Sequence, residues 1–280
     1  MSAEGIGSAL TTEKWSFADK EIEILRADPA EPKSTVVLVH GVCHGAWCWE
    51  NFIRFFAENG YSTIALSLRG HAGSSGHREL NRWRLSDYVE DVADVIRRVG
   101  GRPAVIGHSM GGAIVQRYLA QYPGTTSAAV LLASATAGGL GGRRFLDTVR
   151  GNTARSLWNA IRLVAGRRLD PQSANNTPFF GNRLNPAAAA RHGARLGRES
   201  VRAVADLLKH YLAVPETLPP VLVIGSRADS LFAERSLGQT AQAYRVQPLI
   251  LDGMCHDMML DPAWPVAARH ILSFLDTVGS

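Results

Sequence analysis

The sequence of 280 residues has no apolar run of roughly 18 residues, the length that a membrane-spanning helix needs. Its first residues include an acidic side chain and lack both a basic stretch and an apolar stretch, so we expect no secretory signal. Only three cysteines are present, Cys43, Cys48 and Cys255, and they are too few and too irregularly spaced for a disulfide framework or a metal site. We therefore expect a cytoplasmic protein that binds no metal.

Acidic residues are scarce in one part of the chain. Between residues 138 and 215 there are twelve arginines and one lysine but only four carboxylate side chains, whereas the net charge of the whole chain is +5. Such a basic segment can meet an anionic substrate or a lipid headgroup surface, or it can simply be a solvated helical surface. No nucleic-acid-binding motif accompanies the charge, so we expect no nucleic-acid partner.

Apolar strands alternate with amphipathic helices over most of the chain. The pattern predicts a hairpin over residues 15–26, followed by strands at 35–40, 61–66, 104–106, 128–133, 221–225 and 246–251. Helices are expected between them, most clearly at 85–99, 231–244 and 262–275. Because most of these strands are apolar throughout, we predict a doubly wound, mostly parallel α/β sheet covered by helices on both faces.

The alternation stops between residues 138 and 215. Helical stretches rich in Arg, Ala and Leu are broken there at 170–171, 177–178 and 185–186, where a proline follows Asp, Thr or Asn. We interpret 138–215 as a helical cap inserted into a core made of residues 1–137 and 216–280. The content of 46% hydrophobic and 20% charged residues suits one globular domain with such an insertion.

The most informative stretch is residues 103–122, which reads as a strand, a tight turn and a helix. The turn carries the pattern Gly-x-Ser-x-Gly with Ser109 at its centre, and in this context the pattern predicts a nucleophile elbow. The backbone of Ser109 must then be strained so that the hydroxyl projects above the sheet. Gly107 and Gly111 lack the Cβ atoms that would clash where strand and helix meet.

A serine nucleophile needs a histidine base. Beyond the elbow helix the sequence offers His192, His210, His256 and His270. His256 follows the last strand, where a loop at the carboxyl edge of the sheet can reach back to Ser109, whereas the other three fall in the cap or in the final helix. We therefore expect His256 to be the base.

Three aspartates are candidates for the acid that orients this histidine. Asp229 follows the strand 221–225 at the same edge of the sheet, while Asp252 and Asp257 lie close to His256 in the sequence. Such near neighbours more often cap a loop than reach the far side of the imidazole. We expect Asp229 to hold the imidazole in one tautomer and to stabilise its protonated form.

Two backbone amides are expected to stabilise an oxyanion. The amide of Met110 lies in the first turn of the helix after Ser109, with the helix dipole behind it. The amide of Val42, in the loop after the strand 35–40, is the natural second donor, and Gly41 leaves room there for a substrate. The side chain of His40 is expected to be structural, hydrogen-bonded beneath this loop.

Three further side chains are candidates for contact with a substrate. His44 and Trp47 follow the oxyanion loop, and His108 precedes the nucleophile. Each can equally serve packing, which is the more typical role for His108.

These motifs resemble those of the α/β-hydrolase superfamily over residues 15–275. Within it, HGVCHGAWCW at 40–49 and HDMML at 256–260 are similar to plant-type methyl esterases, hydroxynitrile lyases and their bacterial relatives. Lyases of this type have a threonine after the first histidine and a lysine after the catalytic one, where this chain has Gly41 and Asp257. Epoxide hydrolases and dehalogenases use an aspartate nucleophile, in contrast to Ser109. The resemblance favours an esterase.

The resemblance implies a serine hydrolase that cleaves small to medium carboxylic esters through an acyl-enzyme intermediate and needs no organic cofactor or metal. Hydrolysis of a thioester or of a carbon–carbon bond on the same triad stays an alternative, because the cap would select the substrate and its sequence carries no readable code. A non-catalytic ligand-binding protein is a third reading. The expected partner is a small-molecule ester, with lipid-surface contact through the basic cap possible.

Overall fold

The computed structural model describes residues 9–136, 139, 178–209, 214–232 and 234–279. The strands are β1 (Thr11–Ser16), β2 (Glu21–Ala27), β3 (Ser34–Val39), β4 (Tyr61–Leu66), β5 (Ala104–His108), β6 (Ala129–Leu132), β7 (Val221–Ser226) and β8 (Leu249–Leu251). The α-helices are α1 (Glu50–Glu58), α2 (Leu85–Val99), α3 (Met110–Gln121), α6 (Pro186–Arg195), α7 (Val201–Leu208), α8 (Glu234–Ala243) and α9 (Trp264–Val278), with short 3-10 helices at Ala46–Trp49 and Leu80–Arg82.

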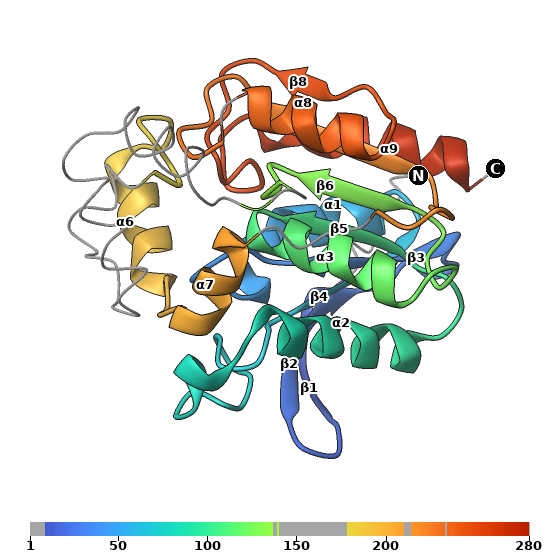
Figure 1. Cartoon of the computed structure of the whole chain (residues 1–280), viewed down its shortest axis with the longest axis vertical. Coiled ribbons are helices and arrows are strands. Elements are labelled where there is room, and N and C mark those ends of the chain that lie inside the picture. The colour runs from blue at the N-terminus through green and yellow to red at the C-terminus, as the bar shows by residue number, and fades with distance from the viewer. Residues whose placement is uncertain (1–8, 137–138, 140–177, 210–213, 233, 280) are drawn as a thin grey trace, which may run out of the picture.

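The strands form one eight-stranded sheet in the order β1-β2-β4-β3-β5-β6-β7-β8. β2 is antiparallel to both β1 and β4, and every other pairing is parallel. Figure 1 shows α3 in front of this sheet and α1 behind it, with α2 packed beside α3. The predicted α/β fold with a mostly parallel sheet is confirmed.

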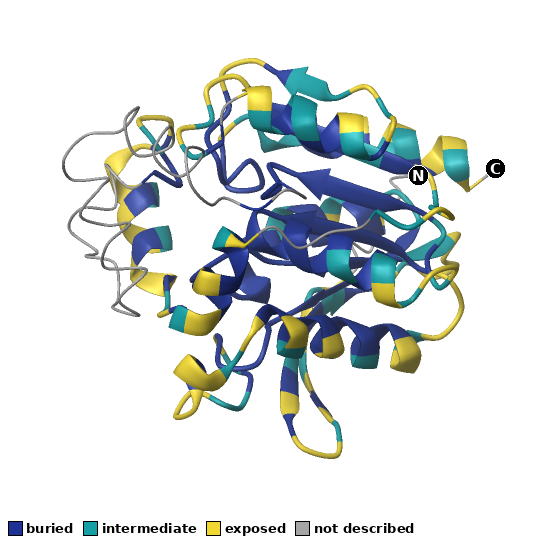
Figure 2. Ribbon diagram, in the orientation of Figure 1, coloured by how far each residue is buried: buried dark blue, intermediate teal, exposed yellow. Residues whose placement is uncertain are grey.

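Burial follows from the apolar strand sequences. Every residue of β4, β5 and β6 is buried, whereas β1 at the edge of the sheet exposes most of its side chains. Figure 2 shows the buried strands at the centre and the exposed positions on the outer faces of the helices. Because both faces of a parallel sheet are covered, its central strands need no polar alternation. The core therefore lies on both sides of β3 to β6.

Most element bounds agree with the sequence pattern, including the strand at 61–66 and the helix at 85–99. The last strand is shorter than the expected 246–251. The amide of Val246 still donates to the Ala241 carbonyl at the end of α8, at 3.0 Å, so the chain joins the sheet only at Leu249. Local apolar character predicted the strand but not the residues that the preceding helix retains.

The predicted cap is described only in part. α6 and α7 lie within it, and α7 contacts α2 of the core. Residues 140–177 and His210 lie outside the described residues, so the boundaries 138 and 215 stay a prediction. None of the helices in the described part of the chain is long and apolar enough to cross a membrane.

A buried charge cluster ties the opening hairpin to the core. Asp91 of α2 is fully buried and accepts hydrogen bonds from the backbone amide and the guanidinium of Arg69, at 2.7 to 2.9 Å. The ammonium of Lys20, in the turn between β1 and β2, lies 3.2 Å from the same carboxylate. One carboxylate therefore pairs with two cations from different parts of the chain.

We expect Asp91→Ala to lower the free energy of unfolding by about 3–5 kcal/mol, because it leaves the buried guanidinium of Arg69 without its hydrogen-bonded carboxylate. Urea denaturation followed by circular dichroism measures this change. Asp94→Ala is the matched control, since this partly exposed carboxylate also contacts Lys20, at 2.5 Å. It should cost no more than about 1 kcal/mol, and equal losses in the two variants would contradict the role given to Asp91.

Candidate active site

Ser109 lies between β5 and α3 with φ 54° and ψ −118°, a conformation that a side-chain-bearing residue rarely adopts. Its carbonyl accepts the amides of Gly112, at 3.0 Å, and Ala113, at 3.3 Å, in the first turn of α3. Its amide donates to Leu132 of β6 at 3.1 Å. The strand, the helix and the neighbouring strand thus hold the strained residue in place, as a nucleophile elbow requires.

Glycines allow the elbow to close. A Cβ on Gly107 would overlap the backbone of Gly111, and a Cβ on Gly111 would overlap the carbonyl of Val39 in β3. A Cβ on Gly41 would come within 2.9 Å of the Ser109 Cβ. The loop after β3 therefore approaches the nucleophile closely enough that only glycine fits at position 41.

Asp229 and His256 meet at the carboxyl edge of the sheet. The Oδ2 atom of Asp229, after β7, lies 2.8 Å from Nδ1 of His256, after β8. The other carboxylate oxygen accepts the amides of Leu231, at 2.7 Å, and Phe232, at 3.0 Å. These bonds fix the carboxylate in the position from which it accepts the hydrogen bond of Nδ1.

The pKa of His256 reflects two opposed effects. Complete burial lowers it, but the Asp229 carboxylate and its hydrogen bond, together with the charge of Asp257, raise it above its usual value. Nε2, on the other side of the ring, is buried and has no hydrogen-bond partner among the described residues. The structure records no hydrogen bond between Nε2 and the Ser109 hydroxyl.

His108 links the base to the elbow. Its Nε2 lies 3.0 Å from the backbone carbonyl of His256, and the two imidazole rings are 4.8 Å apart. Burial, aided by the charge of His256, lowers the pKa of His108 to about 3, so the ring is neutral and can donate to that carbonyl. The residue before the nucleophile thus anchors the backbone of the predicted base.

The predicted oxyanion donors are available. The amides of Val42 and Met110 have no acceptor among the described residues. His40 lies beneath the loop as expected: its Nδ1 lies 2.8 Å from the Gly41 carbonyl and its Nε2 accepts the Leu68 amide at 3.0 Å. Burial keeps the pKa of His40 well below its usual value, which fits a neutral ring that donates on one side and accepts on the other.

His44 and Trp47 are buried beside this loop. The two nitrogens of His44 are occupied by the Val42 carbonyl, at 2.6 Å, and by Oδ2 of Asp257, at 2.9 Å. Trp47 stacks between His44 and His192, with ring centroids 5.3 and 6.2 Å away. For a substrate to bond a nitrogen of His44, one of these hydrogen bonds must break.

The sequence analysis missed Glu199 and considered Asp257 only as a rival for the orienting acid. Asp257 is fully buried against His44 and does not cap the loop with its side chain, and Glu199 of the predicted cap accepts the Cys43 amide at 3.2 Å. They lie 213 and 156 residues from these partners in the sequence. A single carboxylate at that separation leaves no local pattern that could have revealed the contact.

Aromatic rings surround the predicted base. Phe232 lies 5.2 Å and Phe179 6.3 Å from the His256 ring, measured between centroids. Both side chains are buried. They exclude water from the imidazole and form an apolar wall beside the predicted base.

Among the described residues, His108, His256 and Asp257 carry possible metal-ligand atoms within 4.8 Å of one another. Hydrogen bonds already engage one ring nitrogen of each histidine and one carboxylate oxygen of Asp257. Nε2 of His256 is the nitrogen that the predicted base needs to accept a proton, so we assign no metal to this cluster.

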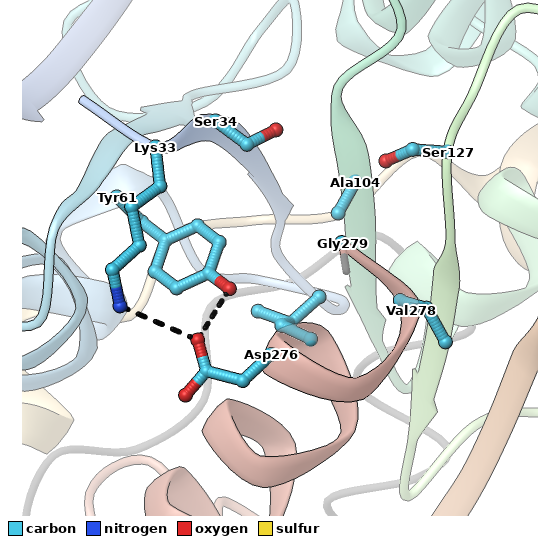
Figure 3. Close-up of a pocket in the computed structure, with 9 residues that line it drawn as sticks. Lys33, Ser34, Tyr61, Ala104, Ser127, Asp276, Val278 and Gly279 are labelled. Carbon is cyan, nitrogen blue, oxygen red and sulfur yellow. Dashed lines mark hydrogen bonds and ion pairs between the residues drawn. The ribbon is translucent and has the colours of Figure 1, made fainter.

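A pocket at the opposite edge of the sheet is remote from this site. Figure 3 shows Lys33, Tyr61 and Asp276 there, with the Asp276 carboxylate 2.8 Å from the Tyr61 hydroxyl and 3.5 Å from the Lys33 ammonium. Its lining residues Ser34, Tyr61 and Ala104 begin parallel strands. Because Ser109, Asp229 and His256 all follow the carboxyl ends of strands, the candidate site lies at the other edge.

Residues 30–263 match the model of a hydrolase family described as serine aminopeptidase, S33. Over 102 residues the chain is 37% identical to methyl jasmonate esterase 1 of Vitis vinifera. The match covers 35% of this chain and 38% of that protein. Over 261 residues it is 25% identical to the monoacylglycerol lipase of Mycolicibacterium smegmatis, covering 88% and 89% of the two chains. The chain thus matches well under half the length of the grape esterase.

Solved structures show the same fold. The monoacylglycerol lipase of Paleococcus ferrophilus superposes with a TM-score of 0.67 at 21% identity, over 96% of this chain and 99% of that one. The fold is the α/β-hydrolase fold, and the chain belongs to the S33 family of hydrolases. The resemblance to plant methyl esterases and their bacterial relatives is confirmed, and the family match identifies the chain as an α/β-hydrolase.

We expect Gly107→Ala to destabilise the protein by more than the about 1–3 kcal/mol that an added methylene costs in a packed core, because the backbone of Gly111 must move. Thermal unfolding of the purified variant measures this loss. Gly238→Ala in α8 is the matched control, since nothing lies within 4 Å of a Cβ there. It should stabilise the helix by about 0.5–1 kcal/mol, and a tolerated alanine at position 107 would contradict the close approach.

Proposed function

We propose that this protein hydrolyses carboxylic esters with Ser109 as nucleophile, His256 as general base and Asp229 as the acid that orients it. The observation that carries the proposal is a strained serine at a strand-to-helix turn on the same edge of the sheet as a buried His–Asp pair. Family membership and the names of the similar esterases support the same reaction.

In the proposed mechanism, Nε2 of His256 takes the proton of the Ser109 hydroxyl as the oxygen attacks the ester carbonyl. The amides of Val42 and Met110 hold the resulting oxyanion. The imidazolium then gives its proton to the departing alcohol, which leaves an acyl group on Ser109. A water molecule deprotonated by the same histidine attacks this acyl-enzyme and releases the acid.

Asp229 is favoured as the acid over its two rivals. Asp252 is exposed and bonds the guanidinium of Arg227 at 2.6 Å. Asp257 is paired with His44, and burial, which raises its pKa, is outweighed by His44, so that the pKa of Asp257 lies below its usual value. We therefore assign Asp257 an electrostatic influence on the base and assign the orienting hydrogen bond to Asp229.

The proposed substrates are esters of small to medium size. The apolar wall of Phe179 and Phe232 beside His256 suits an acyl or alcohol group without charge. The buried positions of His44, Trp47 and His108 lead us to place them behind the oxyanion loop, where they shape the site without bonding the ester. Thioester and carbon–carbon hydrolysis are tested by the same assay, since either would use the same serine.

Ser109→Ala should reduce ester hydrolysis by about 10⁴-fold or more, because it removes the group to which the acyl chain is transferred. Turnover of p-nitrophenyl esters from acetate to decanoate measures the loss. Mass spectrometry after treatment with a fluorophosphonate probe should find one adduct, on Ser109.

Near-normal turnover by the alanine variant would refute the assignment of the nucleophile. An adduct on Ser109 without ester turnover would favour a thioester or carbon–carbon substrate instead. No adduct at all would favour a non-catalytic binding protein.

Asp229→Asn should lower kcat/KM by about 10²–10⁴-fold, because the imidazole loses the partner that fixes its tautomer and stabilises its charge. The attacking serine needs a neutral His256, whose pKa is raised in the native protein. The rate should therefore fall with decreasing pH through a midpoint above 6.5, the usual histidine value. In the variant this midpoint should move to lower pH, because burial still opposes protonation while the charge of Asp229 is gone.

A pH profile of kcat/KM measures both effects. Asp252→Asn is the matched control and should change neither the rate nor the midpoint appreciably. A greater loss in Asp252→Asn than in Asp229→Asn would show that the acid had been assigned wrongly.

A further inference from the structure

In the loop after β3, most backbone polar groups around the Val42 amide are hydrogen-bonded. The Gly41 carbonyl meets His40, the Val42 carbonyl meets Nδ1 of His44 at 2.6 Å, and the Cys43 amide donates to Glu199 at 3.2 Å. The Cys43 carbonyl accepts the amide of Gly197 at 2.7 Å. The Val42 amide, in the middle of this set, has no acceptor among the described residues.

Two buried histidine–carboxylate pairs make these contacts. His44 lies 2.9 Å from Asp257, and His71 lies 3.1 Å from Glu199. All four side chains are at most 1% exposed. The second nitrogen of each histidine also faces a carbonyl oxygen, that of Val42 or of Arg69. A histidine can donate to two acceptors only as an imidazolium, and the paired carboxylate balances that charge.

The pKa values of the second pair agree with this charge state. Burial alone would lower the pKa of His71, but Glu199 raises it above its usual value. Burial would raise the pKa of Glu199, and the charge and hydrogen bond of His71 lower it below its usual value. Both shifts therefore favour the charged forms of the two partners.

The two pairs hold opposite ends of one peptide group. The Val42 carbonyl and the Cys43 amide belong to the same planar unit and point in opposite directions. His44, backed by Asp257, holds the carbonyl end, and Glu199, backed by His71, holds the amide end. Cys43 has φ 64°, a strained conformation that persists only where the surroundings impose it.

We propose that the His44–Asp257 and His71–Glu199 pairs are a clamp that aims the Val42 amide at the oxyanion, which makes Glu199 of the predicted cap and Asp257 positioning residues for catalysis. The proposal rests on the ester hydrolysis proposed above. Buried ion pairs are weak contributors to stability, because desolvation offsets their attraction. A fixed donor, in contrast, costs no reorganisation when the oxyanion forms.

Glu199 offers the sharper test because its hydrogen bonds are complete. Oε2 accepts from the Cys43 amide and from His71, and Oε1 accepts from the Tyr88 hydroxyl at 3.0 Å and from the Ser200 amide at 2.7 Å. In Glu199→Gln, one oxygen becomes an NH₂ group that cannot accept from either of its two donors. The shape is kept while one side of the clamp loses its charge and two hydrogen bonds.

The expected result for Glu199→Gln is a fall in kcat of about 10- to 100-fold, short of the about 10²–10³-fold that loss of a whole oxyanion donor costs. KM should change by less than about threefold, because the clamp acts on the transition state. Binding of a trifluoromethyl ketone, which forms a tetrahedral oxyanion on serine, should weaken by the same factor as kcat. Rates are expressed per active site titrated with fluorophosphonate, so that unfolded protein does not contribute.

The pH profile separates the two sides of the clamp. Glu199 is not among the groups that shift the pKa of His256, whereas Asp257 is. Glu199→Gln should therefore leave the acidic midpoint of kcat/KM unchanged, while Asp257→Asn should lower both kcat and that midpoint. If Glu199→Gln does not fold, loss of ketone affinity in Asp257→Asn decides the question.

Asp206→Asn is the matched control. This buried carboxylate lies on α7, in the same predicted cap, and bonds Arg84 of the core at 3.0 Å without touching the oxyanion loop. It should keep the kcat and ketone affinity of the unmodified protein. If Glu199→Gln also keeps its kcat and ketone affinity, while the protein hydrolyses esters and is labelled on Ser109, the clamp alone is overturned. Absence of turnover or labelling in the unmodified protein would instead overturn the proposed function.

Discussion

The close approach of three backbones, in β3, β5 and α3, is the constraint on which the rest of the structure depends. Gly107 and Gly111 let the strand and helix of the elbow meet, and Gly41 lets the loop after β3 come within contact of Ser109. Any side chain at these points would separate the nucleophile from the loop that carries the Val42 amide. The strain at Ser109 is tolerated because backbone bonds to β6 and to the first turn of α3 hold it.

Several buried histidines form hydrogen bonds around this crossing, and their surroundings shift their pKa values in different directions. The pKa of His108 falls to about 3 and that of His40 lies well below its usual value, both chiefly because of burial. Burial acts on His71 and His256 as well, but the carboxylates of Glu199 and Asp229 outweigh it and raise their pKa values. A hydrogen bond to a carboxylate, which His71 and His256 have, sets the direction in which the pKa of a buried ring moves.

The contact between the predicted cap and the oxyanion loop joins the two parts of the protein at the point of chemistry. Gly197 and Glu199 bond both the carbonyl and the amide of Cys43, so the segment that would select the substrate also supports the loop that would stabilise the oxyanion. A change in the position of this segment would therefore move the backbone of Cys43 and, next to it, the amide of Val42. In the proposed enzyme, selection of the substrate and the arrangement of the oxyanion loop would thereby be linked through a single residue, Cys43.

The succession of strands and helices, the elbow, and the places of Ser109, Asp229 and His256 at strand ends could be predicted from the sequence, because apolar periodicity and glycine spacing act locally. The late start of β8 and the contacts of Asp257 and Glu199 follow from tertiary packing. Their partners lie 213 and 156 residues away, and a lone carboxylate follows no periodic pattern. Such contacts depend on which loops the folded sheet brings to one edge.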